Sequence, residues 1–165
     1  MNLQITNEDL DLCTKLISLM TKKNITVATA ESCTGGLLAT LLTEVSGSSQ
    51  VYKGGVCCYA NEIKEKILKV PADIITYSGA VSEEVASLMA EGIRHLFSVD
   101  FGLSVTGIAG PEGGSVQKPV GTVWCAINHK ELTKVFCLHL KGQRHDIRKS
   151  AALNVLHELF KVLQK

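Results

Sequence analysis

Hydrophobic and polar residues follow one another at two different periods along the chain. Apolar side chains that recur every three or four residues predict five helices, over residues 7–24, 37–45, 61–70, 82–96 and 144–163. Short runs rich in β-branched and aromatic residues predict five strands, over residues 25–28, 56–59, 101–106, 121–127 and 132–140. The elements therefore follow the order α-β-α-β-α-α-β-β-β-α.

This order predicts an α/β fold, a single-domain three-layer α/β/α sandwich with a mixed parallel and antiparallel sheet. Early strands that are separated by helices pair in parallel through crossovers, whereas the last two strands form an antiparallel hairpin around residues 128–130. A chain of 165 residues, 45% of them hydrophobic, is long enough for one substantial core and too short for two typical domains. We therefore expect residues 1–165 to form one domain.

The charge is nearly balanced. With 17 basic and 16 acidic residues the net charge is +1, so the composition favours neither nucleic acid nor an anionic membrane as a partner. The first residues do not resemble a signal peptide, and no apolar run is long enough to cross a bilayer. The six cysteines lie mostly within apolar runs, as is typical of reduced thiols in a core. We expect a cytoplasmic protein.

The sequence lacks the residue spacings of common metal sites. It contains no Cys-x-x-Cys and no His-x-x-x-His, and its five histidines are scattered. We therefore predict no metal site, and we expect no cofactor.

The segment 26–36 joins a β-branched run to a serine, two glycines and a helical pattern. At such a strand-to-helix junction Ser32 would face the positive end of the helix dipole and the unpaired amides of the next residues, Cys33, Thr34, Gly35 and Gly36. Negative charge, such as that of an oxyanion, is stabilised there. The alternative is that Ser32 only caps the helix, since serine is a preferred N-cap residue.

Polar or glycine-rich sequence also follows two other predicted strands, with Lys64 after the second and Thr106 and Gly107 at the end of the third. In open α/β sheets, ligands bind beyond the carboxyl ends of the strands. Lys64 lies in the first turn of its helix, where the dipole disfavours a cation, so a desolvated and neutral Lys64 could act as a base toward Ser32. A solvated surface lysine is the alternative.

Neither glycine-rich segment carries a known phosphate-binding fingerprint. No Gly-Lys-Ser/Thr follows the first, and no Gly-x-Gly-x-x-Gly opens a helix after the second. The Gly-x-Ser-x-Gly elbow of α/β-hydrolases is also missing. A serine nucleophile in this chain would belong to another architecture.

Several motifs, in order, cover nearly the whole chain: Ala30-Glu31-Ser32-Cys33-Thr34-Gly35-Gly36, Gly47-Ser48-Ser49, Tyr59-x-Asn61-x-x-Lys64, Gly79-Ala80-Val81-Ser82, Thr106-Gly107-Ile108-Ala109-Gly110-Pro111, Lys118-Pro119-Val120-Gly121 and Gly142-x-Arg144. In these motifs the chain resembles the CinA C-terminal domain family. The resemblance implies a bacterial nicotinamide mononucleotide (NMN) deamidase without a metal, which converts NMN and water to nicotinic acid mononucleotide and ammonia. It also implies that the pyrophosphatase activity of larger members, linked with an additional N-terminal domain, is absent. Gln143 departs from the family, which often has an acidic residue there.

The chemistry of the residues agrees with the activity that the resemblance implies. Ser32 would attack the carboxamide, Lys64 would take its proton, and Thr106 could orient Lys64 or the carboxamide. Tyr59 is a candidate to stack on the cationic pyridinium ring, although the end of an apolar strand also fits a core position. Cys33 is a rival nucleophile, because a helix N-terminus lowers the pKa of a thiol.

The 5′-phosphate of NMN requires a cluster of hydrogen-bond donors, for which Ser48, Ser49 and Arg144 are the candidates. Each has a structural alternative. The two serines could form a polar turn, and Arg144 could cap or pair on the last helix.

Two functions from different classes stay open. One is the NMN deamidase, and the alternative is a non-catalytic pyridine-nucleotide-binding or competence/damage-associated module. The module would tolerate Ser32→Ala and Lys64→Ala, whereas the enzyme would lose turnover. The apolar-rich helices and the resemblance both favour a homo-oligomer, at least a dimer.

Overall fold

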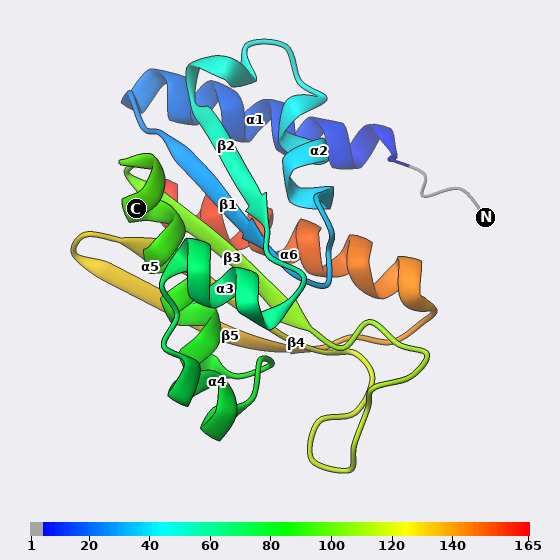
Figure 1. The fold of residues 1–165 in the computed structure, drawn as a ribbon. Coiled ribbons are helices and arrows are strands. Elements are labelled where there is room, and N and C mark those ends of the chain that lie inside the picture. The colour runs from blue at the N-terminus through cyan, green and yellow to red at the C-terminus, as the bar shows by residue number, and fades with distance from the viewer. Residues whose placement is uncertain (1–4) are drawn as a thin grey trace.

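The computed structural model of the chain describes residues 5–165 and is built around one five-stranded sheet (Figure 1). The strand order is β2-β1-β3-β4-β5. The strands are β1 (Val27–Glu31), β2 (Tyr52–Cys57), β3 (Phe101–Gly107), β4 (Thr122–His129) and β5 (Leu132–His139). β1 pairs in parallel with β2 and β3, and β4 lies antiparallel between β3 and β5. The predicted α/β architecture with a mixed sheet is confirmed.

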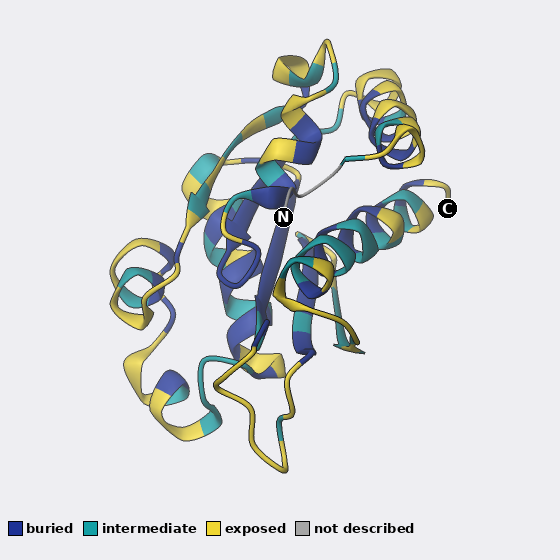
Figure 2. Cartoon of the chain, turned by 90° about the vertical axis from the view of Figure 1, so that its right-hand side faces the viewer, coloured by how far each residue is buried: buried dark blue, intermediate teal, exposed yellow. Residues whose placement is uncertain are grey.

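Helices cover both faces of this sheet. They are α1 (Asn7–Lys23), α2 (Leu37–Thr43), α3 (Asn61–Leu68), α4 (Ala72–Ser78), α5 (Glu83–Phe97) and α6 (Arg144–Leu163), with a 3-10 turn η1 (Ser48–Gln50) before β2. One apolar core joins α1, α2 and α6 to the sheet, and a second joins α3, α4 and α5 to its other face. Figure 2 shows the central strands buried between helices whose outer faces are exposed; β1, β3 and β4 are mainly buried, whereas β2 and β5 at the edges are not.

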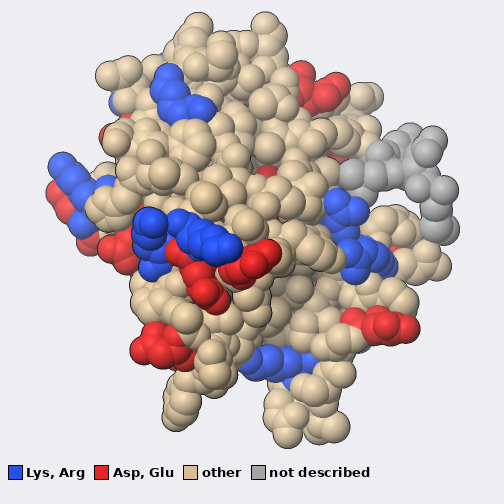
Figure 3. Space-filling model, in the orientation of Figure 1, with Lys and Arg blue, Asp and Glu red and all other residues tan. Residues whose placement is uncertain are grey.

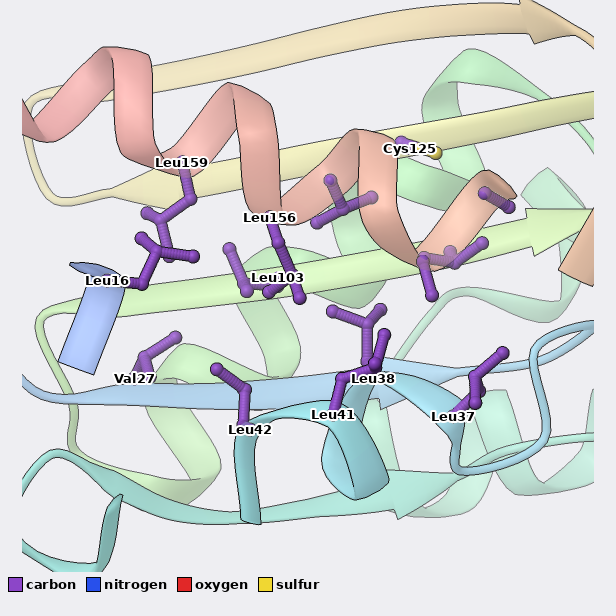
Figure 4. Packing of buried hydrophobic residues seen from close by; sticks show 14 of the residues in the cluster. Leu16, Val27, Leu37, Leu38, Leu41, Leu42, Leu103, Cys125, Leu156 and Leu159 are labelled. Atoms are coloured by element: carbon purple, nitrogen blue, oxygen red, sulfur yellow. The ribbon is translucent and has the colours of Figure 1, made fainter. Parts of the chain in front are cut away.

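The larger core contains leucines from helices that lie far apart in the sequence. Leu38 of α2 and Leu156 of α6 point toward Leu103 of β3, and all three are fully buried (Figure 4). Burial of one such side chain contributes about 1.5–3 kcal/mol to folding. This packing holds the start of α2 firmly against the end of β1.

Three elements differ from the prediction. The first strand covers Val27–Glu31 rather than 25–28, because Ala30 and Glu31 have low strand propensity and hid its end. The second strand covers Tyr52–Cys57 rather than 56–59, because Gly54 and Gly55 have low strand propensity and hid its beginning. Gly55 is required there, since a Cβ atom would lie 2.2 Å from the hydroxyl of Thr29 in β1. Helix α4 was not predicted, because Pro71 was interpreted as the end of a helix only. Pro71 is in fact the N-cap residue of α4, where a missing N–H does no harm.

The three parallel strands place their carboxyl ends at one edge of the sheet. Ser32 directly follows β1, Tyr59 lies two residues beyond β2, and Gly107 ends β3. These segments are distant in sequence but meet at this edge because parallel neighbours end on the same side.

The charged side chains on the face shown in Figure 3 are mixed in sign. Basic and acidic groups lie next to one another over the region of α3, where Lys66 and Glu62 form an exposed ion pair at 3.8 Å. Within residues 5–165, no helix has the length and apolar character to cross a membrane.

Candidate active site

A cavity of about 200 Å³ lies at the carboxyl ends of the parallel strands. It is lined by Ser32, Cys33, Tyr59, Asn61, Lys64, Ala80, Val81, Thr106, Gly107, Ala109 and Arg144. The structure thus brings seven of the twelve predicted site residues to one pocket. The lining contains a hydroxyl, an amine, a guanidinium and backbone from three strand ends. Such a set of groups suits acyl-transfer chemistry.

Ser32 lies in a tight turn between β1 and α2. The amide of Ser32 donates to the carbonyl of Val105 in β3 at 2.9 Å, and the amide of Gly35 donates to the carbonyl of Ser32 at 3.1 Å. Gly35 and Gly36 have φ angles of 60° and 93°, a left-handed conformation that side chains other than glycine rarely adopt. The two glycines therefore allow the chain to reverse directly after the serine.

Glu31 caps the helix that follows this turn. Its carboxylate accepts hydrogen bonds from the amides of Gly36 and Leu38 at 3.0 Å and of Ala39 at 2.9 Å. The positive end of α2 is thereby satisfied from within the chain. The expectation that the amides of residues 33–36 all face a ligand is corrected: those of Gly35 and Gly36 are engaged internally.

Two backbone amides of the turn between β1 and α2 take no part in these hydrogen bonds. Among the described residues, the amides of Cys33 and Thr34 make no backbone–backbone hydrogen bond and are not bound by Glu31. The residue directly after a serine nucleophile commonly supplies an oxyanion donor. Cys33 and Thr34 are therefore the candidate oxyanion donors of this turn.

Lys64 is the largest fully buried side chain of the described residues, at 1% exposure. Its Nζ lies 3.2 Å from Ser32 Oγ, and it donates to the carbonyls of Cys58 at 2.8 Å and Tyr59 at 3.3 Å. Burial lowers the pKa of Lys64 from its ordinary value, because the charged form loses its hydration.

The surroundings of Lys64 fit a neutral amine. A neutral amine has two N–H donors and one lone pair. Nζ lies within hydrogen-bond distance of the carbonyls of Cys58 and Tyr59 and of the hydroxyl of Ser32; in the neutral form the two carbonyls accept both N–H groups, and the lone pair faces the hydroxyl proton of Ser32. A hydroxyl and an amine in this arrangement can act as a nucleophile and a general base.

Cys33 and Thr106 have contacts that limit their chemistry. Burial raises the pKa of the Cys33 thiol to about 12, so the thiolate needed for attack is scarce at neutral pH. Thr106 Oγ1 donates to the carbonyl of Ala80 at 2.7 Å and makes no hydrogen bond to Lys64 among the described residues. Thr106 thus fixes the wall of the pocket at Ala80.

Arg144 crosses the rim of the pocket. Its Nη2 donates to the hydroxyl of Tyr59 at 3.0 Å and its Nη1 to the carbonyl of Gly110 at 2.8 Å. Tyr59 is 60% exposed, so the core position considered from the sequence is wrong and its ring is open to a ligand. Arg144 and Ala109 also border a second cavity of about 430 Å³, lined further by Pro111, Val120, Gly142, Gln143 and His145.

The structure does not bring Ser48 and Ser49 to this pocket. They lie in η1, shortly before the first residue of β2, whereas the pocket lies beyond its last residue. The whole of β2 separates them from Arg144, so a shared phosphate site of these three residues has no support within a single chain. The structure agrees instead with the alternative considered from the sequence, in which the two serines form a polar turn.

Sequence reasoning missed the roles of Glu31 and Arg148. Arg148 donates from Nε at 3.2 Å and from Nη2 at 2.7 Å to the carbonyl of Thr34, in the turn between β1 and α2. The hydroxyl of Thr34 is buried and has no hydrogen-bond partner within residues 5–165. The spacing of Arg144 and Arg148 was an available signal, since residues i and i+4 share one face of a helix.

No part of this pocket resembles a metal centre. Within the described part of the chain, no three His, Cys, Asp or Glu side chains lie close enough together to hold a metal ion. All six cysteines are free thiols, four of them buried.

The chain matches known proteins over most of its length. The model of the CinA C-terminal domain matches residues 9–163. A CinA-like protein of Gemmatimonas aurantiaca is 47% identical over 151 residues, which are 92% of this chain and 35% of that protein. The chain therefore spans about a third of the length of the curated relatives it matches.

Solved structures match over the full chain. The competence/damage inducible protein CihA from Agrobacterium tumefaciens is 36% identical, with a TM-score of 0.94 and complete coverage of both chains. A competence or damage-inducible protein from Enterobacter asburiae is 33% identical, with a TM-score of 0.91, and the alignment covers 96% of this chain and 99% of that one.

Proposed function

The chain belongs to the CinA C-terminal domain family, and we propose that it is a nicotinamide-nucleotide amidohydrolase that converts NMN and water to nicotinic acid mononucleotide and ammonia. The observation that carries the reaction type is the buried amine of Lys64, 3.2 Å from the hydroxyl of Ser32. The family resemblance supplies the substrate. The pocket supplies the chemistry that an amide bond requires, a nucleophile with its base and free amides for the oxyanion.

The first half of the reaction is acylation of Ser32. Ser32 Oγ attacks the carboxamide carbon while its proton passes to Lys64 Nζ, and the amides of Cys33 and Thr34 stabilise the oxyanion. The C–N bond then breaks, and Lys64 returns the proton to the departing nitrogen, which leaves as ammonia. The second half repeats these steps with water: Lys64 takes its proton, the hydroxide attacks the acyl carbon, and Ser32 leaves with the proton as the carboxylic acid is released.

The two cavities suit the two ends of the substrate. The carboxamide and pyridinium fit the smaller one, where the exposed ring of Tyr59 can stack on the cationic ring. The ribose and phosphate extend into the larger one, with Arg144 on the border of both. A guanidinium recognises a phosphate through paired hydrogen bonds.

We propose further that the protein works in the cytoplasm and as at least a dimer. The reduced cysteines support the compartment. Exposed Ile67 and Leu96 at a groove between α3 and α5 support an apolar contact between subunits. The competing function is a non-catalytic pyridine-nucleotide-binding module with a role in competence or the response to damage, as the names of the structural relatives suggest.

The deciding experiment is the release of ammonia from NMN by the purified protein. Nicotinamide, nicotinamide riboside and NAD serve as comparison substrates, Ser32→Ala as the inactive variant and Ser49→Ala as a matched serine variant outside the pocket. Release that Ser32→Ala abolishes and Ser49→Ala retains supports the amidohydrolase. Binding of NMN without ammonia release contradicts it and favours the binding module.

A further inference from the structure

The side chain of Glu31 is buried at 1% exposure and engaged on both oxygens. Oε2 accepts from the amides of Gly36 and Leu38, and Oε1 accepts from the amide of Ala39. All three amides belong to the segment that begins with Ser32. A carboxylate buried at this point therefore fixes where the first turn of α2 lies relative to the end of β1.

The backbone of Glu31 reaches the other half of the catalytic pair. The amide of Cys58 donates to the carbonyl of Glu31 at 2.8 Å, and the Cys58 thiol also points to it at 3.5 Å. The carbonyl of Cys58 in turn accepts a hydrogen bond from Lys64 at 2.8 Å. Glu31 is thus covalently bonded to Ser32, and it is hydrogen-bonded to Cys58, whose carbonyl binds the amine of Lys64.

We propose that Glu31 is a positioning residue of the amidohydrolase: its carboxylate holds the turn 32–36 so that Ser32 stays within reach of Lys64. The proposal rests on the proposed function. Glu31 does not line the pocket and touches no reacting atom, so it acts through Ser32 and the free amides that follow. A shift of the nucleophile by about 1 Å is enough to lower a rate by about 100-fold.

The carboxylate has a second effect on the same turn. Without it, the amides of Gly36, Leu38 and Ala39 would offer a competing anion site next to the pocket. With it, the free donors of the turn 32–36 are those of Cys33 and Thr34. Arg148 holds the turn from the opposite side through the carbonyl of Thr34, so the turn is fixed at two points.

The test compares Glu31→Gln with the wild type. Glutamine has the same shape, but its NH₂ group faces a backbone N–H where the carboxylate accepts one, and it carries no charge. We expect kcat for NMN to fall about 10- to 100-fold, with KM changed by less than about threefold. We also expect faster amide hydrogen exchange, confined to residues 32–39. Glu31→Asp, which keeps the charge on a shorter side chain, is expected to lie between the two in kcat.

The matched control is Asp100→Asn. The Asp100 carboxylate also holds backbone beside β1, accepting from the amide and the hydroxyl of Thr26 at 2.7 Å each, but at the opposite end of the strand. Its loss is expected to lower stability and leave kcat within about twofold of the wild type. A kcat effect specific to Glu31 therefore separates positioning from a general loss of stability.

A folded Glu31→Gln protein with wild-type kcat overturns the proposal, since Glu31 would then be a helix cap alone. Should Glu31→Gln not fold, wild-type kcat in Glu31→Asp overturns it equally. A wild-type protein that releases no ammonia from NMN overturns the proposed function instead. In that case unchanged hydrogen exchange over residues 32–39 in Glu31→Gln would also contradict a role of Glu31 in holding the turn.

Discussion

The hydroxyl of Tyr59 accepts a hydrogen bond of 3.0 Å from Arg144, which joins the loop after β2 to the first turn of α6. The same guanidinium binds the carbonyl of Gly110, so three segments that are distant in sequence meet at the rim of one pocket. None of these contacts neutralises the charge of Arg144. A bound phosphate would do so, and the first two predictions follow from this arrangement.

Replacement of Arg144 by glutamine is expected to raise KM for NMN about 10- to 100-fold, as fits the loss of a charge-assisted contact worth about 1.5–3 kcal/mol. The effect on kcat should be under about threefold, because Arg144 contacts neither Ser32 nor Lys64 among the described residues. Steady-state kinetics measure both constants. Nicotinamide riboside, which lacks the phosphate, is the control substrate, and an equal rise of its KM would contradict phosphate recognition.

Two replacements of Tyr59 distinguish the contribution of its ring to NMN binding from that of its hydroxyl. Tyr59→Phe keeps the exposed ring and loses only the acceptor for Arg144, so we expect KM to rise by less than about threefold. Tyr59→Ala removes the ring as well and is expected to raise KM about tenfold, which corresponds to a cation–π contact of about 1.4 kcal/mol. Titration of NMN into an inactive Ser32→Ala background measures the same difference as binding. Equal affinities of the Phe and Ala variants would rule out stacking.

Cys33 is expected to be dispensable for the chemistry. Burial raises the pKa of its thiol to about 12, so fewer than about one in a thousand of these thiols are ionised at pH 7. Cys33→Ala should keep kcat within about fivefold of the wild type, with some loss of stability from the small cavity it leaves. Alkylation with iodoacetamide at pH 8, followed by mass spectrometry, should modify exposed Cys57 before Cys33. Rapid modification of Cys33 together with loss of activity would restore it as a nucleophile.

Much of the fold could be predicted because local pattern and tertiary structure agree. Residues 101–106 combine apolar and β-branched residues with small ones and carry no charge, as expected of a strand buried on both faces, and β3 was found with an error of one residue. The site followed from topology, since three polar segments at the ends of parallel strands must meet. Lys64 was found because a cation in the first turn of a helix conflicts with the dipole.

The remaining errors have physical causes. Ser48 and Ser49 follow a helix and precede the second strand, both in the prediction at 56–59 and in the structure, so the topology places them at the amino end of β2; they were chosen as phosphate donors by residue type alone. Glu31 was missed as a helix cap because its carboxylate reaches amides five to eight residues ahead through the turn, a contact that no local capping pattern describes.

The turn after Ser32 is expected to be sensitive to substitution at Gly35. Its φ is 60°, and a Cβ atom there would lie 3.2 Å from Nη2 of Arg148. Gly35→Ala should therefore destabilise the protein by about 1–2 kcal/mol, and it should lower kcat because the hydrogen bonds of Arg148 to Thr34 are disturbed. Chemical denaturation and NMN turnover measure the two effects. Gly47→Ala is the control, since that glycine also has a positive φ of 87° but is exposed before η1, at the end of β2 opposite the pocket; equal kcat losses would contradict an effect specific to the turn after Ser32.

The rate is expected to depend on pH through Lys64. Burial, which disfavours the charged form, lowers the pKa of Lys64 from its ordinary 10.5, and the general base of the proposed reaction is the neutral amine. The neutral fraction rises with pH, so kcat/KM for NMN should rise tenfold per pH unit below this lowered pKa and level off above it, before pH 10.5 is reached. Lys64→Arg, whose guanidinium stays protonated, should be inactive at every pH tested. A pH profile of kcat/KM measures the inflection. A profile that is flat from pH 6 to 10, or one that inflects at 10.5, would show that the deprotonation of a buried Lys64 does not control the rate.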